Sequence, residues 1–93
     1  MKFLAVCGFG VGSSMVLKMT LDKVVKEMNI DASVENTDIA TAKATEADAY
    51  FTSQELLKDL KASVKNPVYP VKKYMDKEEV SKQVRAYLDS QEA

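Results

Sequence analysis

One cysteine and a run of glycines lie together near the start of the sequence, and these are the residues that could do chemistry. Cys7 is the single cysteine of the chain, and Gly8, Gly10 and Gly12, which are all of its glycines, follow at alternate positions. Alternate glycines let a backbone turn its amides inward and approach an anion closely. Inward amides also favour the thiolate, the nucleophilic form of cysteine. The pattern predicts a phosphate-sized cradle with a nucleophile at its mouth.

Phosphoryl transfer is the chemistry that this loop suits, because such transfer depends mostly on positioning and on stabilising charge. A helix predicted to start directly after the loop adds the positive end of its dipole. The plain alternative is that Cys7 is a small buried apolar residue and that the glycines form a tight turn. Three glycines in five positions exceed what such a turn requires.

Related glycine loops differ from this one at decisive positions. A nucleotide-binding P-loop ends in Gly-Lys-Ser/Thr, whereas this loop ends Gly12-Ser13-Ser14, and the dinucleotide fingerprint places its third glycine one residue later. A Cys-x5-Arg phosphatase would have arginine at position 13, where a bidentate guanidinium would hold the phosphate. Histidine is absent, which removes the commonest general base. Reversible holding of a phosphoryl group is favoured over hydrolysis, and a phosphatase or anion-binding module stays as the alternative.

Composition narrows the class of protein further. The chain has 93 residues, which predicts one domain over 1–93, and its 13 basic and 14 acidic residues are interspersed, which argues against a nucleic acid partner. No apolar run approaches the roughly 20 residues of a membrane span, and the apolar start is too short for a signal peptide. We expect a cytoplasmic protein that needs neither a metal nor a cofactor.

Strand and helix patterns alternate along the chain. Strands are predicted over 2–7, 32–36, 49–52 and 66–71, and helices over 13–28, 54–62 and 76–89, with a connector over 38–47 that holds a helical turn. Ser13 or Ser14 is predicted to cap the first helix. This alternation predicts an α/β fold, a three-layer α/β/α domain with a four-stranded parallel sheet, similar to flavodoxin and to low-molecular-weight phosphatases. The second strand is expected near a sheet edge, and prolines place the fourth at an edge.

Residues outside the cysteine loop receive simpler interpretations. We predict that a set of aromatic and methionine side chains lies in the core: Tyr50, Phe51, Met15, Met19 and Met28. Polar residues at strand ends could face the same crevice as Cys7, although turn polarity explains them better: Thr37, Asp38, Thr52 and Ser53. Phe9 and Val11 either rim a docking surface or pack inward.

The loop Cys7-Gly8-x-Gly10-x-Gly12-Ser13-Ser14, placed after an amino-terminal strand, resembles the IIB component of bacterial phosphoenolpyruvate-dependent sugar phosphotransferase systems (PTS). The Gly-Ser-Ser ending and Leu17-Lys18-Met19 are most similar to the ascorbate-type branch. The resemblance implies that Cys7 takes a phosphoryl group from a phosphohistidine on a phosphorylated IIA protein. It would donate that group to a sugar, ascorbate or a related sugar or polyol, bound by the membrane-embedded IIC transporter, which would bring the protein transiently to the inner face of the membrane.

The same resemblance implies which residues hold the phosphoryl group. They are the residues of the loop, with main-chain amides and serine hydroxyls as donors: Gly8, Phe9, Gly10, Val11, Gly12, Ser13 and Ser14.

Overall fold

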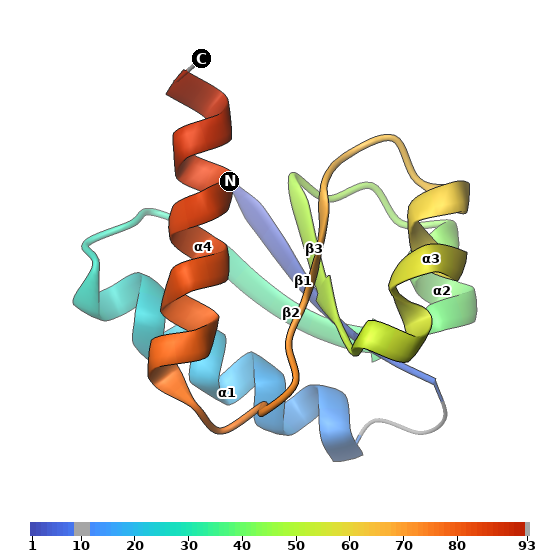
Figure 1. Cartoon of the computed structure of the whole chain (residues 1–93), viewed down its shortest axis with the longest axis horizontal. Helices are drawn as coiled ribbons and strands as arrows, with labels where there is room; N and C mark the ends of the chain where they lie inside the picture. The colour runs from blue at the N-terminus through green and yellow to red at the C-terminus, as the bar shows by residue number, and fades with distance from the viewer. Residues whose placement is uncertain (9–11, 93) are drawn as a thin grey trace.

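A parallel sheet of four strands lies at the centre of the computed structural model, which describes residues 1–8 and 12–92 (Figure 1). The strands are β1 (Lys2–Cys7), β2 (Ser33–Asp38), β3 (Ala49–Thr52) and β4 (Val68–Pro70). Their order across the sheet is β2-β1-β3-β4, and each neighbouring pair is parallel. β1 is therefore an interior strand, whereas β2 and β4 form the edges. The predicted parallel sheet and both predicted edge strands are confirmed.

Four helices in the described part of the chain pack in two layers, one on each face of the sheet (Figure 1). They are α1 (Gly12–Glu27), α2 (Ile39–Lys43), α3 (Gln54–Ser63) and α4 (Lys77–Glu92). α1 and α4 contribute to one core cluster, while α2 and α3 contribute to the other. The predicted three-layer α/β/α fold is confirmed, and the short α2 is the helical turn expected in the second connector.

The interior strand β1 supplies side chains to both cores. Successive strand residues point to opposite faces of a sheet. Phe3 and Ala5 belong to the core under α1 and α4, whereas Leu4 and Val6 belong to the core under α2 and α3. The Phe3 ring meets the Phe51 ring edge-on, with 5.3 Å between centroids. Burial on both faces explains why this segment of the sequence is an uninterrupted apolar run.

The predicted core residues divide into two groups. Tyr50 and Phe51 are buried as expected, and Met28 is partly buried against the core. Met15 and Met19 are 49% and 56% exposed, so their prediction as core residues is wrong. These two residues are four positions apart and share one face of α1, which lies away from the sheet. Helical spacing alone could not distinguish this second apolar face from the one that is buried.

Two element boundaries near Cys7 differ from the predictions. α1 begins at Gly12, so Ser13 and Ser14 belong to its first turn and are not the N-cap residue. β2 continues to Asp38 and does not end at position 36, because it stays paired with β1 until Cys7 lies opposite Asp38. Parallel pairing with an interior strand therefore outweighs the weak strand propensity of this polar segment.

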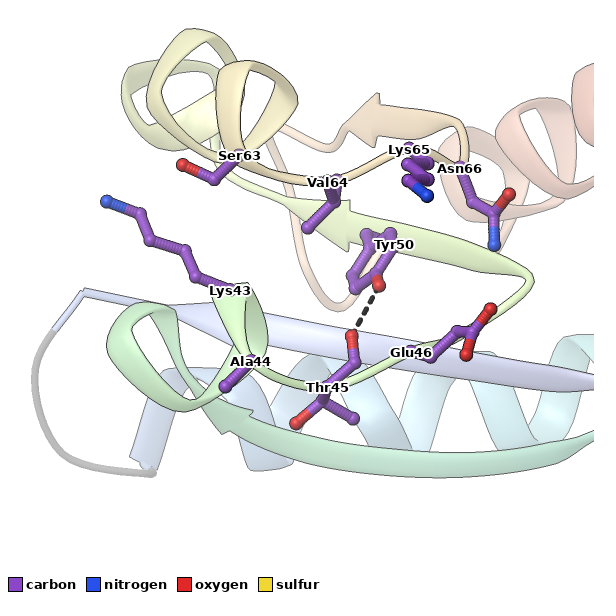
Figure 2. A pocket seen from close by; sticks show the side chains of 9 residues that line it. All are labelled: Lys43, Ala44, Thr45, Glu46, Tyr50, Ser63, Val64, Lys65 and Asn66. Atoms are coloured by element: carbon purple, nitrogen blue, oxygen red, sulfur yellow. Dashed lines mark hydrogen bonds between the residues drawn. The ribbon is translucent and has the colours of Figure 1, made fainter.

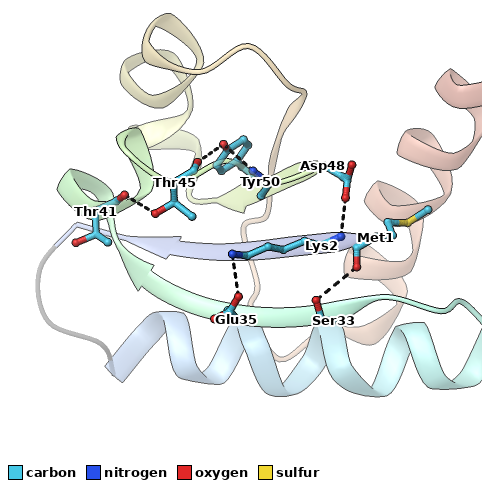
Figure 3. Close-up of polar contacts among 9 residues, drawn as sticks. Met1, Lys2, Ser33, Glu35, Thr41, Thr45, Asp48 and Tyr50 are labelled. Carbon is cyan, nitrogen blue, oxygen red and sulfur yellow. Dashed lines mark hydrogen bonds and ion pairs between the residues drawn. The ribbon is translucent and has the colours of Figure 1, made fainter.

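Polar contacts tie the elements together at the amino edge of the sheet (Figure 3). The backbone amide of Lys2 donates to the Asp48 carboxylate at 2.6 Å, and the Lys2 ammonium group lies 3.0 Å from the Glu35 carboxylate. The Tyr50 hydroxyl donates to the carbonyl oxygen of Thr45 at 2.5 Å. Cys7 lies at the opposite, carboxyl edge of the sheet, where β1 ends.

Candidate functional site

Cys7 is the last residue of β1 and lies at the carboxyl edge of the sheet. Its side chain is 3% exposed, and the thiol contacts the carbonyl oxygen of Thr37 with a sulfur to oxygen distance of 3.7 Å. Ligands of open α/β sheets bind outside the carboxyl ends of their strands. The structure therefore places the one cysteine where a nucleophile of this fold class would act.

Helix α1 follows Cys7 closely in the sequence. Gly8 is partly exposed, and the next described residue, Gly12, begins the helix. The predicted loop residues Phe9, Gly10 and Val11 lie outside the described residues. The first turn of α1 contains no acidic side chain, so no carboxylate of that turn opposes an anion at the positive end of the helix.

Ser14 is the predicted loop residue whose side-chain environment is most clearly defined. It is fully buried in the first turn of α1, and its hydroxyl oxygen accepts a hydrogen bond from the side-chain amide of Asn36 at 3.3 Å. Asn36 lies in β2, two residues before the end of that strand. The contact fixes the start of α1 to the edge strand on one side of Cys7.

Polar residues at the end of β2 mainly shape the backbone. The Thr37 hydroxyl donates to the Asp38 carboxylate at 3.4 Å, and that carboxylate accepts the backbone amide of Thr41 at 3.1 Å as the N-cap of α2. Hydrogen bonds from Thr41 hold the pKa of Asp38 below its usual value of 3.8. The interpretation of these residues as turn and cap residues fits their contacts.

The residues at the end of β3 have similar structural contacts. Thr52 is fully buried and its hydroxyl donates to the carbonyl oxygen of Val6 at 2.9 Å. Ser53 is the N-cap of α3, and its hydroxyl oxygen accepts the backbone amide of Leu56 at 3.4 Å. Thr52 and Ser53 therefore lie at the same edge as Cys7 and fix the backbone there.

Tyr74 is a residue near Cys7 that the sequence motifs did not indicate. It lies between β4 and α4 and is partly buried against the core. Burial raises the pKa of Tyr74 above 10.0, a hydrogen bond with Ser53 opposes this, and negative charge on Cys7 and Glu55 raises it further. The phenol therefore keeps its proton to a higher pH than an exposed tyrosine does. The one sequence signal for a role of Tyr74 near the site was its position after the fourth strand, which ends at the same edge of the sheet as β1.

Two cavities lie away from the cysteine. One, of about 260 Å³, is at the amino edge between the end of α2 and the segment before β4, and Figure 2 shows Tyr50 between Val64 on one side and Thr45 on the other. The other, of about 210 Å³, lies between α1 and the segment after β4 and is lined by Met19 and Met75, among others. Cys7 lines neither of them.

A family model described as "PTS system, Lactose/Cellobiose specific IIB subunit" matches residues 2–86 of the chain. The chain belongs to the PTS IIB family. PTS IIB components are phosphotransferase domains of sugar transport systems, and they work with IIA and IIC partners. The family resemblance inferred from the loop is confirmed for this IIB chain.

Two relatives of this IIB chain carry the name of the ascorbate branch. An ascorbate-specific PTS system EIIB component of Mycoplasma pneumoniae is 29% identical over 90 residues, which cover 95% of each chain. An ascorbate-specific PTS system EIIB component of Escherichia coli O157:H7 is 42% identical over 43 residues, which cover 46% of this chain and 43% of that protein.

The fold of this IIB chain is similar to that of a solved family structure. The lactose-specific IIB component domain of the phosphotransferase system from Streptococcus pneumoniae superimposes with a TM-score of 0.66, covering 96% of this chain and 95% of that chain. The sequence identity is 13%, so this similarity shows the fold alone.

Two further features of this IIB chain concern membranes and metals. Among residues 1–8 and 12–92, no helix combines the length and the apolar character that crossing a membrane requires. Across those same residues, no three Cys, Asp or Glu side chains gather in a way that could hold a metal ion.

Proposed function

We propose that this IIB chain is a phosphocarrier in which Cys7 accepts a phosphoryl group from a IIA phosphohistidine and passes it to a sugar. The observation that carries the proposal is the position of Cys7, which ends an interior strand five positions before the first residue of α1. That position supplies the nucleophile and the positive end of a helix at the same place.

The first transfer exchanges one bond to phosphorus for another. The sulfur of Cys7 attacks phosphorus, the sulfur to phosphorus bond forms, and the nitrogen to phosphorus bond of the donor phosphohistidine breaks. The thiol proton ends on the imidazole nitrogen that lost the phosphoryl group, so atoms and charge balance. In the second transfer a sugar hydroxyl attacks the phosphocysteine, the sulfur to phosphorus bond breaks, and the hydroxyl proton returns to sulfur.

The loop from Gly8 to Ser14 would hold the phosphoryl group during both transfers. Main-chain amides that need no reorganisation stabilise charge that develops on phosphoryl oxygens. The contact of Ser14 with Asn36 supports this role, because it fixes the first turn of α1 relative to the sheet. The roles of Phe9, Gly10, Val11, Gly12 and Ser13 are carried over from the family resemblance.

Ascorbate or a related sugar or polyol is the proposed substrate, presented by a membrane-embedded IIC transporter. Two relatives named as ascorbate-specific EIIB components support this branch. The protein would then act as one phosphocarrier domain in the cytoplasm and transiently at the inner face of the membrane.

The test is incubation with a phosphorylated ascorbate-type IIA protein, followed by intact-mass measurement. The wild-type protein should gain one phosphoryl group, and Cys7→Ser should gain none. Prior alkylation should also block labelling, because Cys7 is the single thiol of the chain. Labelling of the Cys7→Ser variant, or no labelling of the wild type, would contradict the proposal. Sustained release of inorganic phosphate from an aryl phosphate would favour the phosphatase alternative.

A further inference from the structure

An exposed apolar groove lies beside α1, and we call it the methionine groove. Its lining residues come from α1 and from the segment around the start of α4: Val16, Met19, Thr20, Lys23, Met75 and Lys77. Met19 is 56% exposed and Met75 is 81% exposed. Met15, which is 49% exposed, lies one turn before Met19. The groove therefore continues as an apolar surface toward the start of α1.

Core packing does not explain these apolar side chains. α1 already buries a complete apolar face that includes Leu17, Leu21 and Val24, each at most 1% exposed. The groove residues lie on a different side of the helix. Gathered apolar side chains that remain exposed on a folded chain indicate a surface for a partner.

Specific contacts hold the groove in shape. The Thr20 hydroxyl donates to the carbonyl oxygen of Tyr74 at 2.5 Å, which fixes the segment after β4 against α1. Met75 is the next residue, so this bond holds its backbone beside the helix. Lys77 lies 2.9 Å from the Glu27 carboxylate and joins α4 to the far end of α1. The two walls of the groove are therefore fixed to each other.

Helix α1 connects the groove to the candidate phosphoryl site. α1 begins at Gly12, five positions after Cys7, and Met15 and Met19 occupy its first two turns. In Figure 1 the segment between β4 and α4 passes beside α1 on the side toward which the strands run. A protein that brings a phosphohistidine to the sulfur must cover this edge and would extend over the groove. Stable protein interfaces bury about 800 Å² on each partner, which requires more surface than the cysteine loop alone.

We propose that the methionine groove is the docking surface for the IIA phosphoryl donor, and this inference rests on the proposed function. The partner would place an apolar ridge in the groove, flanked by a carboxylate that faces Lys23. Charge favours this occupant, because Lys23 is exposed and the lining contains no acidic residue, whereas Lys77 is already paired with Glu27. The cytoplasmic loops of membrane transporters carry an excess of Lys and Arg, which Lys23 would repel. Methionine side chains adapt readily to an apolar partner surface.

The test measures the rate of phosphoryl transfer as a function of the concentration of phosphorylated IIA. Met19→Glu and Met75→Glu should each raise the KM for phosphorylated IIA about tenfold and leave kcat unchanged, because they disturb association and not the transfer step. Lys23→Glu should also raise KM, through lost charge complementarity. Ala62→Glu is the matched control, because it adds the same charge at an exposed position of α3 on the opposite face of the sheet. It should behave as the wild type.

A second measurement follows transfer from the phosphorylated protein to ascorbate in vesicles that contain the IIC transporter. If Met19→Glu and Met75→Glu transfer the phosphoryl group to the sugar as fast as the wild type does, the groove serves the docking of IIA. If this step slowed while the IIA step did not, the groove would serve the transporter and the proposal would be wrong. It would also be wrong if sedimentation showed that the variants had lost a dimer, or if neither step changed. Failure of the wild type to accept phosphate would instead contradict the proposed function, and the inference with it.

Discussion

The hydroxyl of Thr52 donates a hydrogen bond to the backbone carbonyl oxygen of Val6 at 2.9 Å. Thr52 is the last residue of β3, and Val6 directly precedes Cys7 in β1. Both residues are fully buried, so the bond lies in an environment where an unpaired polar group is costly. The contact joins the carboxyl ends of two neighbouring strands directly below the cysteine. Thr52 therefore fixes the backbone of the residue before Cys7.

Replacing Thr52 with valine should lower the free energy of unfolding by about 1 kcal/mol, because the shape is kept while the hydrogen bond is lost. Urea unfolding followed by circular dichroism measures this change. Thr45→Val is the control, because the hydroxyl of Thr45 donates to the carbonyl oxygen of Thr41 in an exposed place, and it should change stability by less than about 0.5 kcal/mol. Equal stability of the two variants would show that the bond to Val6 contributes nothing measurable.

Asn29 should be sensitive to alanine and tolerant of glycine. It follows α1 with a φ of 60°, and the amide of Ile30 donates back to the carbonyl oxygen of Val25 at 2.8 Å, as in a helix ending with a left-handed residue. Asn29→Ala should lower the free energy of unfolding by about 1 kcal/mol, because alanine is strained in this region. Asn29→Gly should be at least as stable as the wild type in the same urea titration, and the reverse order would contradict this account.

The central sheet could be predicted from the sequence because the hydrophobicity of its residues reflects their burial. Phe3 to Val6 are apolar at every position since both faces of β1 are buried, and the prolines of the fourth strand indicate an edge. Met15 and Met19 could not be placed correctly, because hydrophobicity does not reveal whether a second apolar helix face is covered. Such a face becomes apparent only when the packing of the segment after β4 is known.

Only the part of the candidate site that lies in one short segment could be predicted. Cys7 and the three glycines fall between positions 7 and 12, so the sequence motif itself indicates their chemistry. Tyr74 is 67 positions away from Cys7 and carries no motif, and the two come close enough for charge on Cys7 to raise the pKa of Tyr74 because β3 and β4 run parallel to β1. The spacing of neighbouring residues in the sequence cannot predict which distant residues the parallel sheet brings together.

Removing the N-cap of α2 should have an effect that depends on pH. Hydrogen bonds from Thr41 lower the pKa of Asp38, so the ionised form stabilises the fold above the unfolded value of 3.8, and this stabilisation is lost as the pH falls through the folded pKa. Asp38→Ala should be less stable than the wild type at neutral pH, and the difference should narrow in acid. Urea midpoints over an acid pH series measure it, with Asp38→Asn, which still caps a helix, as the control. A gap of constant size would exclude a role for the ionised carboxylate.

Ionisation of the Tyr74 phenol should lower the free energy of unfolding at alkaline pH. Burial raises its pKa above 10.0, so the folded state holds the phenol proton more tightly than the unfolded chain does. This stabilisation is complete below pH 10.0 and is lost as the pH rises through the folded pKa of Tyr74. Tyr74→Phe should lose less stability than the wild type over that range. Tyr87, whose pKa burial also raises, should account for part of the remaining slope, and Tyr87→Phe measures that part.

Gly8 should accept alanine without loss of stability, although it follows the reactive cysteine. A Cβ atom placed there would lie 3.8 Å from Leu56 Cδ1, which is an ordinary van der Waals distance, and the backbone is outside the left-handed region. Alanine at such a position restricts the unfolded chain, so Gly8→Ala should raise the free energy of unfolding by about 0.5 kcal/mol. Alanine also keeps the main-chain amide, so Cys7 of the variant should still gain a phosphoryl group from phosphorylated IIA.

Urea unfolding and intact-mass measurement check the two outcomes separately. A stable variant that gains no phosphate would mean that the site needs the space that glycine leaves open, and a destabilised variant would mean that the backbone at Gly8 is strained.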